Sequence, residues 1–213
     1  MKKISIYIFV SVFLGSCTSL KNLAPGYSQA FDAIKQLYFG YENNITSEMV
    51  ESIPYSSALL KIGNGPIGLI ILESIQTNSE TWVSADNMYI QIQNGKIVKT
   101  AGLNNNLTST VGSISFSEKV DTNYSIYLSY DHPKLNNLEL TNKLIKKEMQ
   151  DVELLSGIKK LTLYEENFEN EYLNWRGVNQ YWVDDTGYVL KSKQYISTKL
   201  PPIEIEVTKK PAK

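Results

Sequence analysis

Cysteine and histidine are scarce in this chain of 213 residues, and their scarcity excludes several kinds of chemistry. A structural zinc site needs about four ligands, mostly Cys or His, and a disulfide needs a pair of thiols. The chain has one of each, Cys17 and His132. His132 stands in Tyr-Asp-His-Pro-Lys, which is typical of a turn, and no Gly-x-Ser-x-Gly segment is present to supply a nucleophile. We therefore predict a surface or turn histidine, a fold stabilised by its core, and no metal or other cofactor.

A charge of one sign and a membrane-spanning run are also missing. The 21 basic and 22 acidic residues nearly cancel, so we expect no nucleic-acid partner. A glycan ligand would have to be held by local contacts. The N-terminal apolar stretch, 4–14, is too short for a bilayer core of roughly 30 Å, which needs about 20 residues. Behind Lys2 and Lys3 it is typical of a secretory signal peptide.

Cys17 directly follows this stretch, in the order Leu14-Gly15-Ser16-Cys17. The order resembles the lipobox of bacterial lipoproteins. The resemblance implies cleavage before Cys17, a diacylglycerol on its sulfur, and a further acyl chain such as palmitate on its new amino group. Each buried CH₂ contributes about 0.8 kcal/mol, so several acyl chains attach a protein lastingly. The inner-membrane retention signal, an Asp in place of Thr18, is absent, and we expect the outer membrane, facing the periplasm. The alternative is an ordinary signal peptide followed by chance by a cysteine.

These features divide the chain into four parts. We predict a signal peptide over 1–16, a lipidated Cys17 with a tether over 17–26, a single β-rich domain over 27–207, and a disordered tail over 208–213. At the start of the domain, apolar residues recur at intervals of three and four between Tyr27 and Tyr41, which predicts an amphipathic helix. Its polar face is poor in Lys and Arg, so we expect it to pack on the sheet rather than on lipid.

After this helix the sequence pattern changes to that of β-strands. Apolar and polar residues alternate over 88–93, and Asn94-Gly95 suits a type I′ hairpin turn that would set Ile92 opposite Ile97. Hairpins that follow one another without helices predict an antiparallel meander, curled into a barrel-like or sandwich-like domain. The segment 138–155 fits either a helix or an edge strand, and we favour a strand because β character continues after it.

Residues for glycan chemistry are present by type. The 14 Tyr and 3 Trp could stack on sugar rings, although core packing is the default for aromatics in a β domain. Glycosidases use paired carboxylates, for which Asp184-Asp185, Glu165-Glu166 and Asp86 are candidates. In a turn such as 184–187, however, an Asp accepts backbone N–H groups without any catalytic role.

Two segments, 82–103 and 179–196, followed by 201–207, resemble the group 4 capsule polysaccharide lipoprotein family of the YjbF/GfcB type. The matching positions are Trp82-Val83-Ser84-Ala85-Asp86, Asn94-Gly95-Lys96-Ile97-Val98, Gly102-Leu103, Tyr181-Trp182-Val183-Asp184, Thr186-Gly187, Lys191-Ser192 and Gln194. Asn87 replaces an expected Gly, and Asn also tolerates a positive φ. Between Asn104 and Val178 no motif aligns. The resemblance implies an outer-membrane lipoprotein that serves in making or exporting capsule or other extracellular polysaccharide, and it carries over no catalytic residue.

We therefore predict a non-enzymatic accessory in capsule or exopolysaccharide assembly or export, attached to the outer membrane through Cys17. Its partners would be the polysaccharide or other export proteins, and the candidate contact residues are Trp82, Trp182, Tyr181, Asp86 and Asp184. The alternatives are a periplasmic carrier of lipid or another apolar ligand and, third, a glycan-modifying enzyme. A deep cavity lined by Ile and Leu would favour the carrier, and carboxylates converging in a cleft would favour the enzyme.

Overall fold

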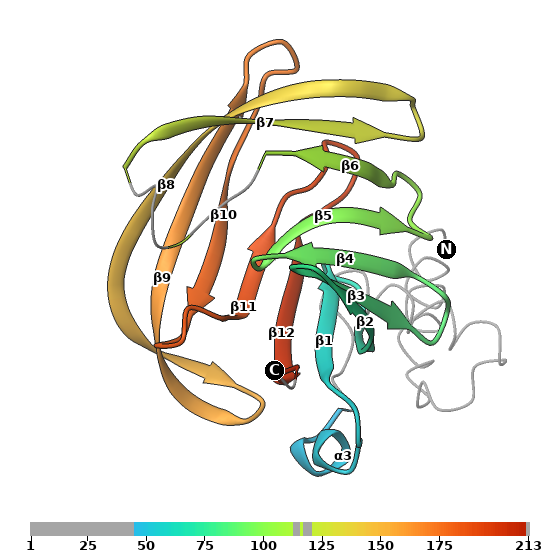
Figure 1. Cartoon of the computed structure of the whole chain (residues 1–213), viewed down its shortest axis with the longest axis vertical. Helices are drawn as coiled ribbons and strands as arrows, with labels where there is room; N and C mark the ends of the chain where they lie inside the picture. The colour runs from blue at the N-terminus through green and yellow to red at the C-terminus, as the bar shows by residue number, and fades with distance from the viewer. Residues whose placement is uncertain (1–44, 113–115, 117–120, 212–213) are drawn as a thin grey trace, which may run out of the picture. The chain divides into compact units, whose positions relative to one another are not determined.

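The computed structural model describes residues 45–112, 116 and 121–211, and this part of the chain is mostly β-structure. A short helix, α3 (Ser47–Glu51), comes first, and its N-terminus is capped by Thr46, whose Oγ1 accepts a hydrogen bond from the Met49 amide at 3.2 Å. The strands are β1 (Ser57–Ile62), β2 (Ile67–Gln76), β3 (Ser79–Ser84), β4 (Tyr89–Gln93), β5 (Lys96–Ala101), β6 (Leu107–Val111), β7 (Asn123–Tyr130), β8 (Leu135–Leu154), β9 (Gly157–Asn170), β10 (Trp175–Val183), β11 (Val189–Gln194) and β12 (Ile203–Lys209) (Figure 1). The helix predicted over 27–41 lies outside the described residues.

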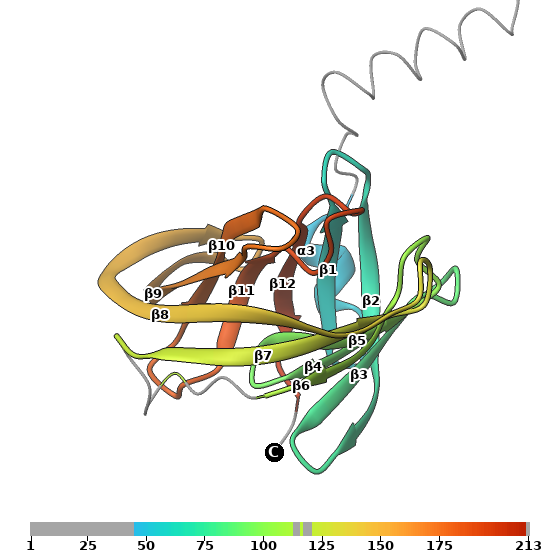
Figure 2. The same cartoon turned by 90° about the horizontal axis from the view of Figure 1, so that it is seen from above.

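These strands form one antiparallel sheet in which consecutive strands are neighbours, apart from one seam. The last strand, β12, returns to pair with β1, with Ile203 facing Ile62. The two edge strands, β5 and β6, lie side by side, and the Leu107 amide donates to Thr100 Oγ1 at 2.9 Å, but no ladder is assigned between them in the described chain. Seen from above, the sheet curls so that β4 and β5 lie opposite β10–β12 (Figure 2). The predicted antiparallel meander, curled into a barrel-like domain, is confirmed.

Alternating side chains fill the inside of the curled sheet. On β12, Ile203, Ile205 and Val207 are buried and the residues between them are not, as the sequence pattern predicts. The predicted pairing of Ile92 with Ile97 is also present. In a barrel of this kind the inward residues pack against one another and form the core.

The segment 138–155 is a strand, as favoured, but it is not at an edge, because β8 pairs with both β7 and β9. Its register breaks between Lys146 and Met149. Beyond the break the β8–β9 hairpin contacts β12, where the Leu155 amide donates to Glu206 Oε1 at 2.6 Å. Met149 supported the helix-like spacing, yet its side chain is 62% exposed. The register break shifts the alternation of buried and exposed side chains along β8. This shift explains why the apolar spacing in the sequence fitted a helix as well as a strand.

The meander places its turns alternately at two ends of the sheet, and one end is closed by hydrogen bonds between loops. There, Asn105 Nδ2 donates to the carbonyl of His132 at 2.7 Å, and Asn106 Nδ2 donates to Asp131 Oδ2 at 2.7 Å. The Tyr130 hydroxyl donates to the carbonyl of Ile196 at 2.6 Å. The His132 side chain is exposed, in the turn that the sequence predicts. We call the opposite end the mouth; it holds the β2–β3, β4–β5 and β10–β11 turns.

At the mouth, the β4–β5 turn approaches β11 closely. Asn94 and Gly95 have φ angles of 48° and 77°, as a type I′ turn requires. A Cβ atom added to Gly95 would lie 2.2 Å from Cγ2 of Val189. Glycine is therefore needed here both for the backbone angle and for the contact with β11.

We expect Gly95→Ala to destabilise the protein more than Gly157→Ala does. Gly157 also has a positive φ, 101°, but an added Cβ would meet nothing within 4 Å. Both variants carry the backbone cost of about 1–2 kcal/mol, and only Gly95→Ala adds overpacking of about 1–3 kcal/mol. Urea unfolding measures the difference. Equal losses in the two variants would contradict the close packing of the turn on Val189.

Candidate functional site

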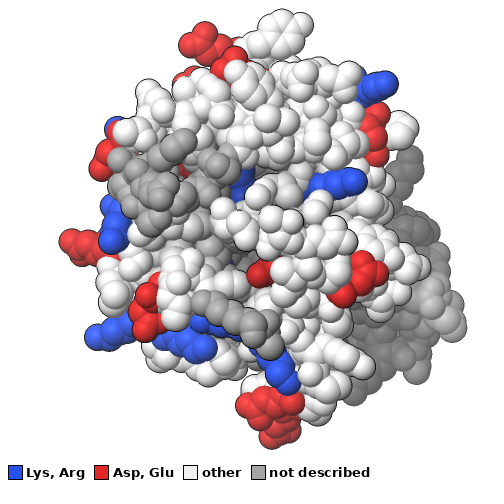
Figure 3. All heavy atoms as spheres, in the orientation of Figure 1, with Lys and Arg blue, Asp and Glu red and all other residues white. Residues whose placement is uncertain are grey.

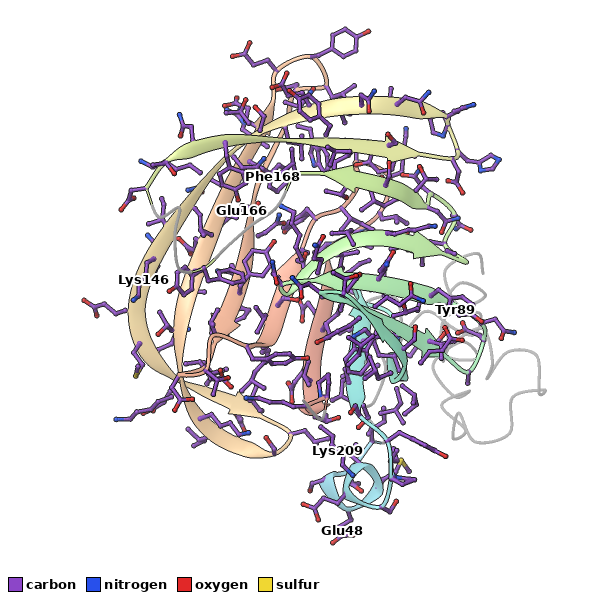
Figure 4. The ribbon with its side chains drawn as sticks, in the orientation of Figure 1. Glu48, Tyr89, Lys146, Glu166, Phe168 and Lys209 are labelled. Carbon is purple, nitrogen blue, oxygen red and sulfur yellow. The ribbon has the colours of Figure 1, made fainter. Side chains whose placement is uncertain are left out.

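A cluster of buried polar groups lies inside the sheet, centred on Glu166 of β9, whose side chain is fully buried (Figure 4). Oε1 of Glu166 accepts from Lys96 Nζ and, at 2.5 Å, from the Tyr124 hydroxyl. Oε2 accepts from Asn179 Nδ2 at 2.8 Å and from the Tyr181 hydroxyl at 2.9 Å. We call these five residues the Glu166 cluster. The carboxylate is therefore satisfied on both oxygens by donors from β5, β7 and β10.

The electrostatics of the cluster favour the charged form of Glu166. Burial acts to raise the pKa of Glu166, but the charge of Lys96 and the hydrogen bonds outweigh it and hold that pKa below its ordinary value. Burial and the neighbouring carboxylate raise the pKa values of Tyr124 and Tyr181, so both phenols remain donors. A buried ion pair is tolerated only when its remaining hydrogen-bonding positions are filled, as they are here.

Gln194 holds the β4–β5 turn from the opposite side. Its Oε1 accepts from the Ile97 amide at 2.9 Å, and its Nε2 donates to the Gly95 carbonyl at 2.9 Å and to Ser192 Oγ at 3.0 Å. The start of β5 is thus fixed to β9 through Lys96 and to β11 through Gln194. Most of these residues are positions that carried the sequence resemblance.

We expect Glu166→Gln to lower the free energy of unfolding by about 3–5 kcal/mol, because it leaves the Lys96 charge buried without a counter-ion. Adding Lys96→Met should restore much of the loss. The control is Glu165→Gln on the same strand, which removes an exposed pair with Lys147 (3.2 Å) and should cost at most about 1 kcal/mol. A Glu166→Gln loss no larger than that of the control, measured by urea unfolding at neutral pH, would contradict the role of the cluster.

The same cluster predicts an acid-dependent loss of stability. The folded pKa of Glu166 lies below its ordinary value of 4.5, so its charge stabilises the fold above that pH, and this contribution is lost as the pH falls through the folded pKa. The difference in unfolding free energy between wild type and Glu166→Gln should therefore narrow at pH values below 4.5. Glu80, whose pKa is raised by burial, should behave oppositely: relative to Glu80→Gln, the wild type loses stability as the pH rises above 4.5. A pH-independent difference for both variants would refute these assignments.

A groove of about 1320 Å³ opens at the mouth, beside the β4–β5 turn. Its apolar lining comes from Ile75, Phe116, Tyr164, Val183, Tyr188, Val189 and Pro211. Of these, Tyr164, Val183 and Val189 belong to a small core next to the Glu166 cluster. Its polar lining comes from Asn78, Glu80, Asn94, Lys146, Asp184, Asp185, Thr186 and Lys210. We call this hollow the mouth groove. Ligand sites of β-barrels are commonly found at such a mouth.

Asp184 organises one wall of the mouth groove. Its Oδ1 accepts from the Thr186 amide (2.9 Å), the Thr186 hydroxyl (2.6 Å) and the Tyr188 amide (3.0 Å), which confirms the turn role predicted from the sequence. Its Oδ2 forms an ion pair with Lys210. Burial acts to raise the pKa of Asp184, but the hydrogen bonds from Lys210, Thr186 and Tyr188 outweigh it and lower that pKa.

Glu80 also lines the mouth groove and was missed by sequence reasoning. Its Oε2 accepts from Trp82 Nε1 at 3.1 Å and from the Tyr188 hydroxyl at 3.2 Å. Burial raises its pKa, and the two hydrogen bonds oppose that effect. The available signal was the spacing of Glu80 and Trp82, which puts both side chains on the same face of one strand.

The structure does not bring the five predicted contact residues together. Trp82 and Tyr181 are 1% and 0% exposed and lie in the interior. Trp182 points outward from β10, in a shallow hollow that the β8–β9 hairpin borders. Asp86 is exposed in the β3–β4 turn, where it accepts from Ser84, and Asp184 is at the mouth. Only Asp184 of the five lines the mouth groove, and glycan contact by these residues stays a prediction.

Within 45–112, 116 and 121–211, no three His, Cys, Asp or Glu side chains are grouped so as to hold a metal ion. No helix in this part of the chain is long and apolar enough to cross a membrane.

The fold and the groove together define an antiparallel β-domain with a filled interior, one closed end and a polar site at the other. The chain belongs to the family described as "Group 4 capsule polysaccharide lipoprotein gfcB, YjbF", which matches residues 27–208. The resemblance stated from the motifs is therefore confirmed, and the match spans the segment 104–178, in which no motif aligned.

Relatives and a solved structure agree with this family. The chain is 22% identical to "Uncharacterized lipoprotein GfcB" of Escherichia coli K12 over 98% of its length and 99% of that relative. It is 21% identical to "Uncharacterized lipoprotein YjbF" of the same organism, over 78% of this chain and 80% of the relative. The crystal structure of the hypothetical lipoprotein YmcC from Escherichia coli K12 superposes with a TM-score of 0.71 at 22% identity, covering 85% of this chain and 96% of that one. This structural likeness establishes the fold.

Proposed function

We propose that this protein is a lipid-anchored, non-enzymatic accessory in the assembly or export of capsule or other extracellular polysaccharide. It is attached through Cys17 to the outer membrane, on the periplasmic side, and holds glycan in the mouth groove. The observation that carries this proposal is the groove itself, whose walls include the Asn94-Gly95 turn and the 184–188 turn. Both turns contain positions on which the sequence resemblance to the capsule lipoprotein family rests.

The lining of the mouth groove suits a sugar better than an apolar ligand. Asn78 offers an amide and Asp185 a carboxylate, and the Thr186 hydroxyl can accept a hydrogen bond while it donates to Asp184. The ring of Tyr188 offers a surface on which a sugar could pack. Asp185 is exposed and forms no ion pair within the described chain. Asp184, Glu80, Thr186, Tyr188 and Lys210 contact one another within the wall of the groove and hold it in shape.

The alternative of an apolar-ligand carrier has little support in the cavities. The mouth groove mixes polar and charged with apolar side chains, and its described lining contains one Ile and no Leu. The hollow between Glu80, Ile92 and Val189 measures about 20 Å³, close to the room for one water molecule. The enzyme alternative needs two carboxylates free to act. Both oxygens of Asp184 are engaged, and Glu80 is bound by Trp82 and Tyr188.

Deletion of the gene tests the proposed role most directly. We expect surface polysaccharide to fall in the deletion strain and to return when the wild-type gene is supplied. The measurement is the amount of polysaccharide extracted from the cell surface, under conditions in which the parent strain makes it. Unchanged polysaccharide in the deletion strain would overturn the proposal.

The anchor has a separate test in Cys17→Ala. We expect this precursor to remain uncleaved and to leave the outer-membrane fraction, because the lipid attachment and the processing step both depend on the thiol. Ser16→Ala keeps a small residue before the cysteine and serves as the matched control, which should be processed normally. A Cys17→Ala protein that is processed and sediments with the outer membrane would contradict the anchor.

A further inference from the structure

We propose that the mouth groove binds an anionic glycan, a saccharide that carries carboxylate or phosphate groups, through lysines of the β8–β9 hairpin. The inference rests on the proposed function, since it names the chemical class of the glycan held at that site. Its basis is a set of three lysines without ion pairs, one in the mouth groove and two in the hollow that adjoins it, in a chain whose net charge is −1.

The lysines come from two adjoining hollows. The mouth groove contains Lys146, and a neighbouring hollow of about 440 Å³ contains Lys159 and Lys160. Both hollows are lined by Asp184, Asp185 and Lys210, so they adjoin each other at these three residues. Figure 3 shows lysine and arginine atoms along the lower margin of the molecule, over the ends of β8, β9 and β12.

The charges of this surface do not cancel. Lys210 is paired with Asp184, whereas Lys146, Lys159 and Lys160 form no ion pair with any described carboxylate. The carboxylates in the lining of the two hollows are those of Asp184, Asp185, which forms no ion pair, and Glu80, which accepts from Trp82 and Tyr188. The four lysines of the two hollows outnumber these three carboxylates by one, so an anionic ligand would meet a surface with a small net positive charge. Opposite charges at short range favour binding.

Two of the lysines lie next to aromatic rings. Lys146 Nζ is 6.0 Å from the centroid of Tyr164, and Lys210 Nζ is 5.4 Å from the centroid of Tyr188. A sugar ring that packs beside either tyrosine would bring its acidic substituent within reach of an ammonium group. The site thus combines a ring contact with a charge contact, which a neutral sugar could use only in part.

An anionic lipid surface is the competing partner for exposed lysines, and the mouth suits it less well. The lysines line concave hollows rather than a flat face. Helix α3 precedes β1 at the same end and carries Glu48 and Glu51 outward, with Glu48 labelled at the lowest part of the ribbon in Figure 4. These carboxylates would meet the lipid phosphates first.

The test is a binding measurement on the full mature lipoprotein in neutral detergent. The probes are an oligogalacturonate, its fully methyl-esterified form, which has the same sugars without charge, and a phosphorylated dextran beside plain dextran. We expect the charged probes to bind and the neutral counterparts to bind at least about tenfold more weakly, a difference of about 1.4 kcal/mol. Binding should weaken as salt is added.

The variant is the triple substitution Lys146→Gln, Lys159→Gln and Lys160→Gln, with Lys210 retained because it holds the 184–188 turn. We expect it to weaken binding of the charged probe about tenfold. The control triple, Lys61→Gln, Lys99→Gln and Lys134→Gln, removes the same charge away from the groove and should leave binding unchanged. Preference for oligogalacturonate or for phosphorylated dextran identifies the acidic group.

Three results would overturn the inference: equal binding of charged and neutral probes, no binding of any charged probe, or lysine-dependent binding only to phosphatidylglycerol vesicles. The last would assign the lysines to the membrane. Failure here is distinct from failure of the proposed function. If the deletion strain loses polysaccharide but the charged probes do not bind, only the anionic-glycan inference is refuted. If the probes bind but the deletion strain keeps its polysaccharide, only the cellular role is refuted.

Discussion

The buried ion pair between Lys96 and Glu166 is the constraint on which the arrangement of the barrel depends. A carboxylate fully removed from water must be met by donors from several directions. The carboxylate belongs to β9, and three of its donors belong to β7 and β10. The cation, Lys96, comes from the β4–β5 hairpin on the other side of the interior. The first residue of β5 is therefore drawn into the barrel.

This contact has consequences at the seam and at the mouth. Within the described residues β5 pairs with β4 on one side, and no ladder is assigned to β6 on the other. The hydrogen bonds that Lys96 and Ile97 make across the interior, to Glu166 and Gln194, therefore fix β5 in place of a second neighbouring strand. The same bonds hold the Asn94-Gly95 turn in close packing contact with Val189. That turn forms part of the wall of the mouth groove, which links the stability of the interior to the shape of the proposed glycan site.

Local features could be predicted from the sequence, and contacts between distant residues could not. The Asn94-Gly95 turn, the pairing of Ile92 with Ile97 and the role of Asp184 follow from short-range geometry. Alternation implies that one of Glu165 and Glu166 points inward, but the pairing of Glu166 with a lysine 70 positions away depends on how the sheet closes. Trp82 shows the same limit, because a β-strand aromatic suits a core and a glycan surface equally well until its neighbours are known.

Amide hydrogen exchange at Ile97 tests the central claim most directly, because this amide donates to Gln194 within the contact that fixes β5. If the buried pair and Gln194 hold the hairpin in place, the amide should exchange only through global unfolding, with an opening free energy equal to that from urea unfolding. Exchange at the rate of exposed loop amides would show that the β4–β5 hairpin leaves the interior independently. That result would contradict the account.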